Sequence, residues 1–99
     1  MLMKISVDGP FEIYEQHVSE AIMASVHHVL ALFIDRIPEV KLIVHKTRHD
    51  RQRFVFECVL QLGTHKPGYW VKFYGIGASC ESAVTGALAE AKHYLSYQV

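Results

Sequence analysis

The stretch HKTRHDRQR, residues 45–53, concentrates side chains that could bind phosphate. It holds one lysine, three arginines and two histidines around a single acid, Asp50. Arginine offers a planar fork of donors that matches phosphate oxygens, and histidine adds charge only under mildly acidic conditions. Two interpretations fit the stretch: a contact for a nucleic-acid backbone, or a solvated hairpin tip that keeps strand edges soluble. The basic and imidazole residues concerned are His45, Lys46, Arg48, His49, Arg51 and Arg53.

Charge is segregated along a chain whose formal net charge is zero. Residues 1–35 contain one lysine against five acids, whereas residues 36–72 hold eight of the ten Lys and Arg against three acids. Such segregation can place a positive patch on a neutral protein, and anionic partners respond to the patch. Neutrality therefore permits nucleic-acid binding but argues against a strong nonspecific binder.

The remaining reactive residue types do not assemble into a catalytic or metal site. Cys80 sits near a predicted helix N-terminus, but His93 lies more than three turns away on that helix, and Cys58 alternates with core residues of a strand. The histidine pairs have no completing Cys or paired carboxylate, and no GxSxG, P-loop or HExxH motif occurs. We expect no enzyme, no metal and no cofactor.

Periodicity predicts the elements that would position these residues. Residues 3–7 alternate and form a short strand before the Asp8-Gly9-Pro10 turn signal. An apolar stripe at helical spacing predicts a long helix over about residues 13–34, ended by Pro38. Its core positions are Val18, Ile22, Val26, Val29, Leu30 and Phe33.

Three further strands and a second helix follow. Alternation predicts strands over residues 39–46 and 53–62, which place residues 45–53 at the hairpin between them. The turn-rich GTHKPG, residues 63–68, leads to a strand over residues 69–76. Ser79 is a good N-cap for the last helix, whose core positions are Val84, Leu88, Ala91 and Leu95. Gly86 within that helix suits a close approach to a neighbour.

The order β-α-β-β-β-α predicts one α+β domain over residues 1–99: a two-layer fold with both helices on one face of a four-stranded sheet, similar to double-stranded-RNA-binding domains. The other sheet face then stays uncovered. It is expected to carry basic, aromatic and β-branched residues: Lys41, Ile43, His45, Arg53, Val55, Glu57, Val59, Gln61, Trp70, Lys72 and Tyr74.

That face allows two interpretations. Trp70 and Tyr74 could stack on unpaired bases, as aromatics of other open sheets do in RNA recognition. The same aromatics, flanked by Ile43 and Val59, would equally suit a homodimer interface. Glu57 would repel phosphate and favours the second interpretation, whereas Lys72 favours the first.

Several short stretches are similar to the ribosome hibernation-promoting factor family, also called sigma-54 modulation proteins. ISVDGPFEIYEQHV resembles the family's opening strand and helix start, and LFIDRIPEVKLIVHK resembles the end of its first helix and the following strand. SCESAVTGALAEAKHYL is similar to the family's last helix, with Ala83 and Val84 holding the pattern. The resemblance covers nearly the whole chain.

The resemblance implies a cytoplasmic factor that docks on the small ribosomal subunit, contacts ribosomal RNA and inhibits translation in idle cells under stress. The RNA-binding residues predicted are Lys41, His45, Lys46, Arg48, His49, Arg51, Arg53, Trp70, Lys72 and Tyr74. We expect no membrane contact, since no apolar run approaches the length of a membrane span. The alternative is a self-associating module that keeps the fold without the lysines that the family carries along both helices.

Overall fold

A computed structural model describes residues 4–9, 16–49, 53–66 and 68–97; within these ranges the side chains of residues 16–19, 48, 49, 53 and 54 are not described. The order of elements is β1 (Lys4–Asp8), α1 (Gln16–Leu30), the 3-10 helix η2 (Ala31–Phe33), β2 (Glu39–His49), β3 (Arg53–Gly63), β4 (Trp70–Gly77) and α2 (Cys80–Tyr97). The predicted order β-α-β-β-β-α is confirmed.

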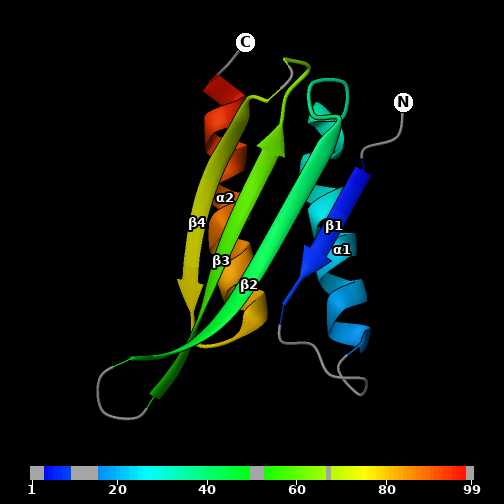
Figure 1. Cartoon of the computed structure of the whole chain (residues 1–99). Coiled ribbons are helices and arrows are strands. Elements are labelled where there is room, and N and C mark those ends of the chain that lie inside the picture. The colour runs from blue at the N-terminus through cyan, green and yellow to red at the C-terminus, as the bar shows by residue number, and fades with distance from the viewer. Residues whose placement is uncertain (1–3, 10–15, 50–52, 67, 98–99) are drawn as a thin grey trace.

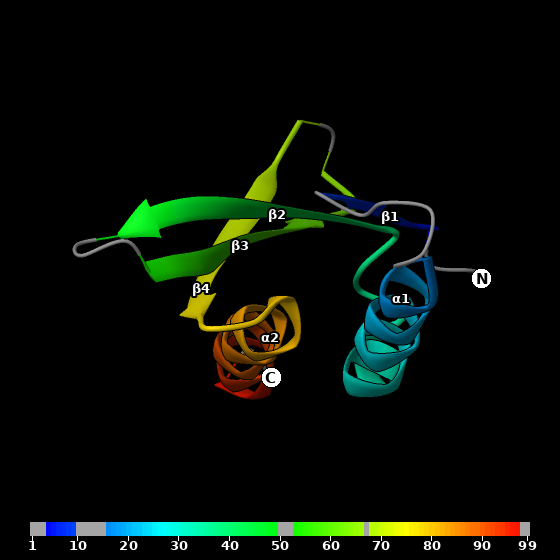
Figure 2. The same cartoon turned by 90° about the horizontal axis from the view of Figure 1, so that it is seen from below.

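The sheet has the strand order β1-β2-β3-β4 (Figure 1). β1 is parallel to β2, because α1 carries the chain back between them, and the β2–β3 and β3–β4 pairs are antiparallel. Both helices lie on the same side of the sheet, which leaves the opposite face without a helical cover (Figure 2). The two-layer α+β fold predicted from the sequence is therefore confirmed.

The core lies between the helices and the inner face of the sheet. From β2 and β3 it takes the alternating residues Val40, Leu42, Val44, Cys58, Leu60 and Leu62, all buried, whereas Phe56 on the same side is only partly buried. From the helices it takes Ile22, Val26 and Leu30 of α1, and Ala83, Val84, Ala87, Leu88, Ala91 and Leu95 of α2. Val29 and Phe33 are only partly buried, and Val18 lies among the side chains not described.

The ends of both helices follow local hydrogen-bonding rules. The α-helical part of the first helix ends at Leu30, before the predicted residue 34, and η2 tightens the chain ahead of Pro38. Ser79 caps α2: its Oγ accepts a hydrogen bond from the Ser82 backbone N–H at 3.1 Å. At the other end of α2, Arg36 Nη2 donates to the Leu95 carbonyl oxygen at 3.2 Å and ties the α1–β2 connection to that helix.

The hairpin of β2 and β3 extends beyond the rest of the sheet (Figure 1). Within the described residues, β4 pairs with β3 from Phe56 to Gly63, and β1 pairs with β2 from Glu39 to Ile43. Residues 47–49 and 53–55 thus pair only with each other, as a two-stranded arm. β2 runs longer than the predicted 39–46, because residues 47–49 continue the pairing into this arm, and β3 ends one residue later than predicted, at Gly63.

Candidate nucleic-acid interface

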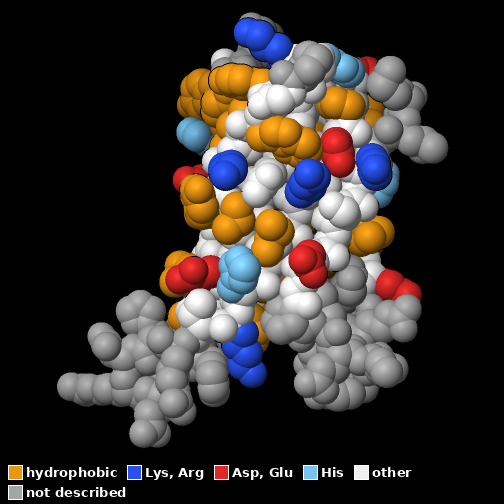
Figure 3. All heavy atoms as spheres, in the orientation of Figure 1, with side chains coloured by type: hydrophobic (Ala, Val, Ile, Leu, Met, Phe, Trp, Pro, Cys, Tyr) orange, Lys and Arg blue, Asp and Glu red, His pale blue; other side chains and the backbone are white. Residues whose placement is uncertain are grey.

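The uncovered face of the sheet is organised in rows that cross β2, β3 and β4. The register aligns Lys41 with Gln61 and Lys72, then Ile43 with Val59 and Tyr74, then His45 with Glu57 and Ile76. We call these the lysine row, the apolar row and the acidic row. Figure 3 looks onto this face and shows hydrophobic side chains in a band across the strands, with Lys and Arg side chains above it.

Trp70 stands at the end of this face beyond the lysine row. Its six-membered ring lies over Gly63, where an added Cβ would come within 3.1 Å of the ring, and the Lys41 ammonium is 4.7 Å from the ring centroid. The absence of a side chain at Gly63 is what lets the ring lie against the strand. Lys41 gains a cation–π contact there. One side of the indole is therefore used internally, and Trp70 is only partly exposed.

A hollow of about 270 Å³ lies beside Trp70. Its lining includes two cationic residues, Lys4 of β1 and Lys66 of the β3–β4 loop, one acid, Glu39 of β2, and the exposed Tyr69. The Lys66 ammonium is 5.9 Å from the centroid of the Tyr69 ring. Positive charge beside aromatic surface is the combination that binds unpaired nucleotides, through phosphate and base respectively. We call Lys4, Lys41, Lys66, Lys72, Tyr69 and Trp70 the lysine–aromatic sector.

Hydrogen bonds of the β3–β4 loop fix that part of the sector. The Tyr69 carbonyl accepts from the Thr64 hydroxyl at 3.2 Å and from the Thr64 backbone N–H at 3.3 Å. Gly68 has φ +76°, which a glycine adopts at no steric cost. His65 Nε2 donates to the Asp35 carbonyl oxygen at 2.7 Å and anchors the loop to the α1–β2 connection. These hydrogen bonds fix the turn that carries Lys66 and Tyr69.

The middle of the face is apolar and then acidic. Tyr74 is 63% exposed and Ile76 is 59% exposed, whereas Ile43 and Val59 are half-buried beside them. Glu57 is exposed in the acidic row, and Asp8 of β1 pairs with Ile43 at the end of the apolar row. Phosphate would be repelled from this half of the face. The predicted RNA contacts Lys41, Lys72 and Trp70 are therefore separated from the arm by an apolar and acidic strip.

The predicted basic tip is divided by strand alternation. His45 lies on the uncovered face, whereas Lys46 lies on the helix side, where its ammonium is 5.9 Å from the ring centroid of Phe56. The register pairs Arg48 with Phe54 and His49 with Arg53. The side chains of Arg48, His49 and Arg53, and all of Arg51, lie outside the described residues. The phosphate-binding role of this stretch stays a prediction.

The surface also holds residues that were not predicted for it, among them Lys4, Lys66, Tyr69 and Ile76. Lys4 joins the face because β1 pairs with β2 in a register that sets Lys4 against Glu39. The alternation of Ser6 and Lys4 with half-buried Ile5 and Val7 was a usable signal for that placement. Lys66 and Tyr69 come from a turn, whose direction only the hydrogen bonds above determine.

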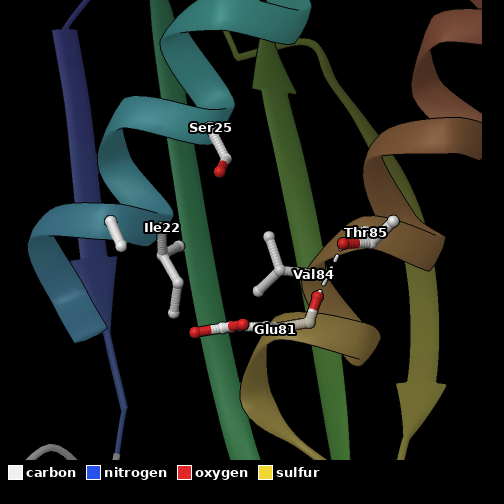
Figure 4. Close-up of a pocket in the computed structure, with 6 residues that line it drawn as sticks. Ile22, Ser25, Glu81, Val84 and Thr85 are labelled. Carbon is white, nitrogen blue, oxygen red and sulfur yellow. Dashed lines mark hydrogen bonds between the residues drawn. The ribbon is translucent and has the colours of Figure 1, made fainter.

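The groove between the helices offers a poorer site (Figure 4). It has a volume of about 200 Å³ and is lined by Ala21, Ile22, Ser25, Glu81, Val84 and Thr85. The Thr85 hydroxyl donates to the Glu81 carbonyl oxygen at 2.8 Å, so that group is already satisfied. A lining with one carboxylate and no cation cannot attract phosphate.

Reactive groups elsewhere are accounted for by packing. Burial raises the pKa of the Cys58 thiol to about 11, with a smaller contribution from Cys80, so Cys58 is a protonated core residue at neutral pH. Within the part of the chain that the structure describes, no group of three or more His, Cys, Asp and Glu side chains could hold a metal ion. None of the described helices is long and apolar enough to cross a membrane.

Comparisons with known proteins give a match in fold. No protein-family model matches the sequence, and no curated protein matches it either. Among solved structures, a ribosomal subunit interface protein from Coxiella burnetii has a TM-score of 0.66 at 13% identity, covering 98% of this chain and 97% of that one. The Thermus thermophilus Protein Y N-terminal domain has a TM-score of 0.59 at 18% identity, with both chains covered completely. Both belong to the family that the sequence resembles, so the resemblance extends to the fold.

Proposed function

We propose that this protein is a cytoplasmic RNA-binding factor that docks on the small ribosomal subunit and inhibits translation in idle cells. The observation that carries the proposal is the lysine–aromatic sector, exposed on a fold shared over nearly its full length with a ribosomal subunit interface protein. Fold alone does not specify function, so the surface must supply the argument. The protein acts by occupying a site, without catalysis.

The sector suits an RNA strand in two ways. Lys41 and Lys72 stand on either side of Gln61 in one row, and neighbouring strands lie about 4.8 Å apart, so the two lysines can contact phosphates along one stretch of backbone. Tyr69, 55% exposed, and the outer side of Trp70 offer ring faces to unpaired bases. The basic stretch of residues 45–53 is proposed to supply a second set of contacts, from Arg48, Arg51 and Arg53.

Co-sedimentation of the purified protein with small ribosomal subunits, at low and moderate salt, tests this proposal. Wild-type protein should co-migrate saturably with the subunit and lose affinity steeply as salt rises. The double variant Lys41→Ala/Lys72→Ala should bind more weakly and reduce the salt slope by roughly 2, since two phosphate contacts are lost. The triple variant Arg48→Ala/Arg51→Ala/Arg53→Ala should abolish binding if the arm is a phosphate contact.

The matched control is Lys92→Ala, which removes one exposed lysine from α2 on the helical side of the molecule. It should sediment as the wild type does. Normal binding by both the lysine and the arginine variants would refute the proposal. Binding that is insensitive to salt would also refute it, because phosphate contacts necessarily release counterions. A cell-free translation reaction then tests inhibition directly, with the same four proteins.

A further inference from the structure

We propose that the uncovered sheet face also binds a second copy of the same face, in a two-fold symmetric dimer whose axis runs along the apolar row. This inference goes beyond the proposed ribosome binding and does not depend on it. Three observations carry it: the exposed apolar row, the unlike charges of the rows on its two sides, and their equal spacing from it.

The apolar row is exposed hydrophobic surface on the uncovered face of the sheet. It consists of Ile43, Val59 and the 63% exposed Tyr74, and the 59% exposed Ile76 extends it on β4. Exposed apolar side chains that adjoin across three strands are typical of interaction surfaces, and tyrosine is enriched in them. An RNA strand bound to the lysines would leave these aliphatic side chains exposed to solvent. A second protein face would bury them.

Symmetry makes the charges complementary. The lysine row and the acidic row each lie two residues along the strands from the apolar row, about 7 Å on opposite sides of it. A two-fold axis along the apolar row therefore lays the lysine row of one copy over the acidic row of the other. It preserves position across the strands, so each residue faces a residue of its own strand in the second copy.

Glu57 is the centre of this arrangement. It faces Gln61 of the second copy, whose neighbours in the same row are Lys41 on one side and Lys72 on the other. Adjacent strands are about 4.8 Å apart and packed sheets about 10 Å apart, distances that lysine and glutamate side chains can bridge. Each Glu57 thus lies between Lys41 and Lys72 of the second copy. The two-fold axis generates the same arrangement a second time, with the two copies exchanged. Lys72 also faces Ile76, whose side chain can pack on its methylene stem.

The proposed dimer contact is made by the three rows, and the margins of the face lie at its rim or outside it. Asp8, at the β1 end of the apolar row, meets its own counterpart at the rim, where water and salt screen the repulsion. The arm and the hollow beside Trp70 lie outside the three rows. The dimer therefore covers Lys41 and Lys72, and the same axis carries the arm of the second copy toward the Trp70 end of the face. Because the two lysines are shared, a dimer cannot bind RNA through the lysine row.

Sedimentation equilibrium of the full chain, without ribosomes, tests the dimer through a charge swap. Wild-type protein should show a reversible monomer–dimer equilibrium. Glu57→Lys should weaken dimerisation by roughly tenfold or more, because it sets a lysine between two lysines. Lys41→Glu/Lys72→Glu should weaken it similarly, by gathering three glutamates. The triple swap Lys41→Glu/Lys72→Glu/Glu57→Lys should restore the dimer, since it inverts every pair.

The rescue distinguishes this proposal from its alternatives. Restoration in the triple swap requires the lysine row of one copy to meet the acidic row of the other. Bound RNA cannot produce this restoration, because the triple swap replaces both of the lysines proposed to contact phosphate by glutamate. Lys92→Glu, which changes an exposed α2 lysine, should leave the equilibrium unchanged. A monomeric wild-type protein, an unaffected Glu57→Lys dimer or an unrescued triple swap would each overturn the inference. Circular dichroism of each variant checks that the fold is retained.

Discussion

Gly86 of α2 lies directly against Gly75 of β4: a Cβ built on Gly86 would be 3.6 Å from the Gly75 Cα. Built on Gly75 instead, a Cβ would overlap the Ala83 carbonyl oxygen and lie 2.6 Å from the Ala87 backbone nitrogen. The two glycines thus mark the point where the helix backbone crosses the strand most closely. Their tolerance of a methyl group is opposite, because only Gly75 points into backbone atoms that cannot rotate away.

Alanine at these two positions should therefore change stability in opposite directions. Gly75→Ala should lower the free energy of unfolding by about 3 kcal/mol, since α2 must move off β4 to admit the methyl group. Gly86→Ala should raise it by up to about 1 kcal/mol, through better helix propensity at an exposed position with ordinary van der Waals clearance. Urea denaturation measures both. Equal effects of the two variants would contradict the described crossing.

Cys58 makes stability depend on alkaline pH. Burial raises the pKa of its thiol from 9.0 to about 11 in the folded protein, so the folded state holds the proton more tightly than the unfolded state. The stabilisation is fully present below pH 9 and is lost as the pH rises through 11. Near about pH 10.5, wild type should have lost about 2 kcal/mol relative to its value at about pH 8.

The variant Cys58→Ala isolates this effect from every other group that titrates at alkaline pH. It lacks the thiol, so its own loss of stability over the same pH range should be smaller than that of wild type by the same 2 kcal/mol or so. Urea denaturation of both proteins under reducing conditions gives the difference. Parallel pH profiles would show that the Cys58 thiol is not buried.

Ser79 should contribute a separable amount to the start of α2. Its Oγ accepts from the Ser82 N–H, and its own N–H donates to the Ser82 Oγ at 3.1 Å. Ser79→Ala removes the acceptor for an N–H of the first turn and should cost about 1 kcal/mol. Ser79→Asp keeps an acceptor and adds negative charge at the positive end of the helix, so it should retain most of the stability. Thermal denaturation by circular dichroism compares the three proteins.

Truncating Trp70 should lower the stability of the fold more than truncating Tyr74, because Trp70 is partly buried and Tyr74 is mostly exposed. Trp70 lies over Gly63 and is partly buried, so Trp70→Ala should lower stability by about 2 kcal/mol, roughly half the cost of truncating a fully buried tryptophan. Tyr74→Ser removes a ring that is 63% exposed and should leave stability within about 0.5 kcal/mol of wild type. Urea denaturation measures both, and a Tyr74→Ser protein as unstable as Trp70→Ala would contradict this assignment.

Trp70 also reports on its own surroundings, since it is the only tryptophan in the chain. Its fluorescence should change when single-stranded RNA binds the lysine–aromatic sector, because a stacked base alters the environment of the indole. Lys41→Ala should weaken that response, through loss of a phosphate contact beside the ring. An unchanged spectrum at RNA concentrations that saturate co-sedimentation would place binding elsewhere on the protein.

Periodicity was sufficient to predict the fold because most of this chain obeys simple burial rules. Val40, Leu42 and Val44 alternate along a strand, and Ile22, Val26 and Leu30 recur at helical spacing; each set is buried as expected. The close approach at Gly86 was also predicted correctly. The end of the first helix was placed too late, because η2 continues the helical pattern of the sequence with tighter hydrogen bonding.

The surface was less predictable because it depends on pairing between distant strands. Alternation correctly placed Lys41, Lys72 and Tyr74 on the uncovered face. The sequence alone does not fix the register between strands, and it is the register that places Glu57 of β3 on the other side of the apolar row from Lys41 of β2 and Lys72 of β4. The separation of Lys46 from His45 follows directly from alternation, although the compact charge of residues 45–53 suggested one patch. Turn residues such as Tyr69 needed their hydrogen bonds to be placed.

The parallel pairing of β1 with β2 has a consequence for how the chain folds. β2, β3 and β4 are joined by hairpins, whereas Lys4 must find Glu39 across the whole of the first helix. Local pairings close at a lower entropic cost, so the three-stranded meander should form before β1 is added. β1 is also a five-residue edge strand, none of whose residues is buried. Its amide protons should consequently exchange with solvent faster than those of β3, which is held on both sides.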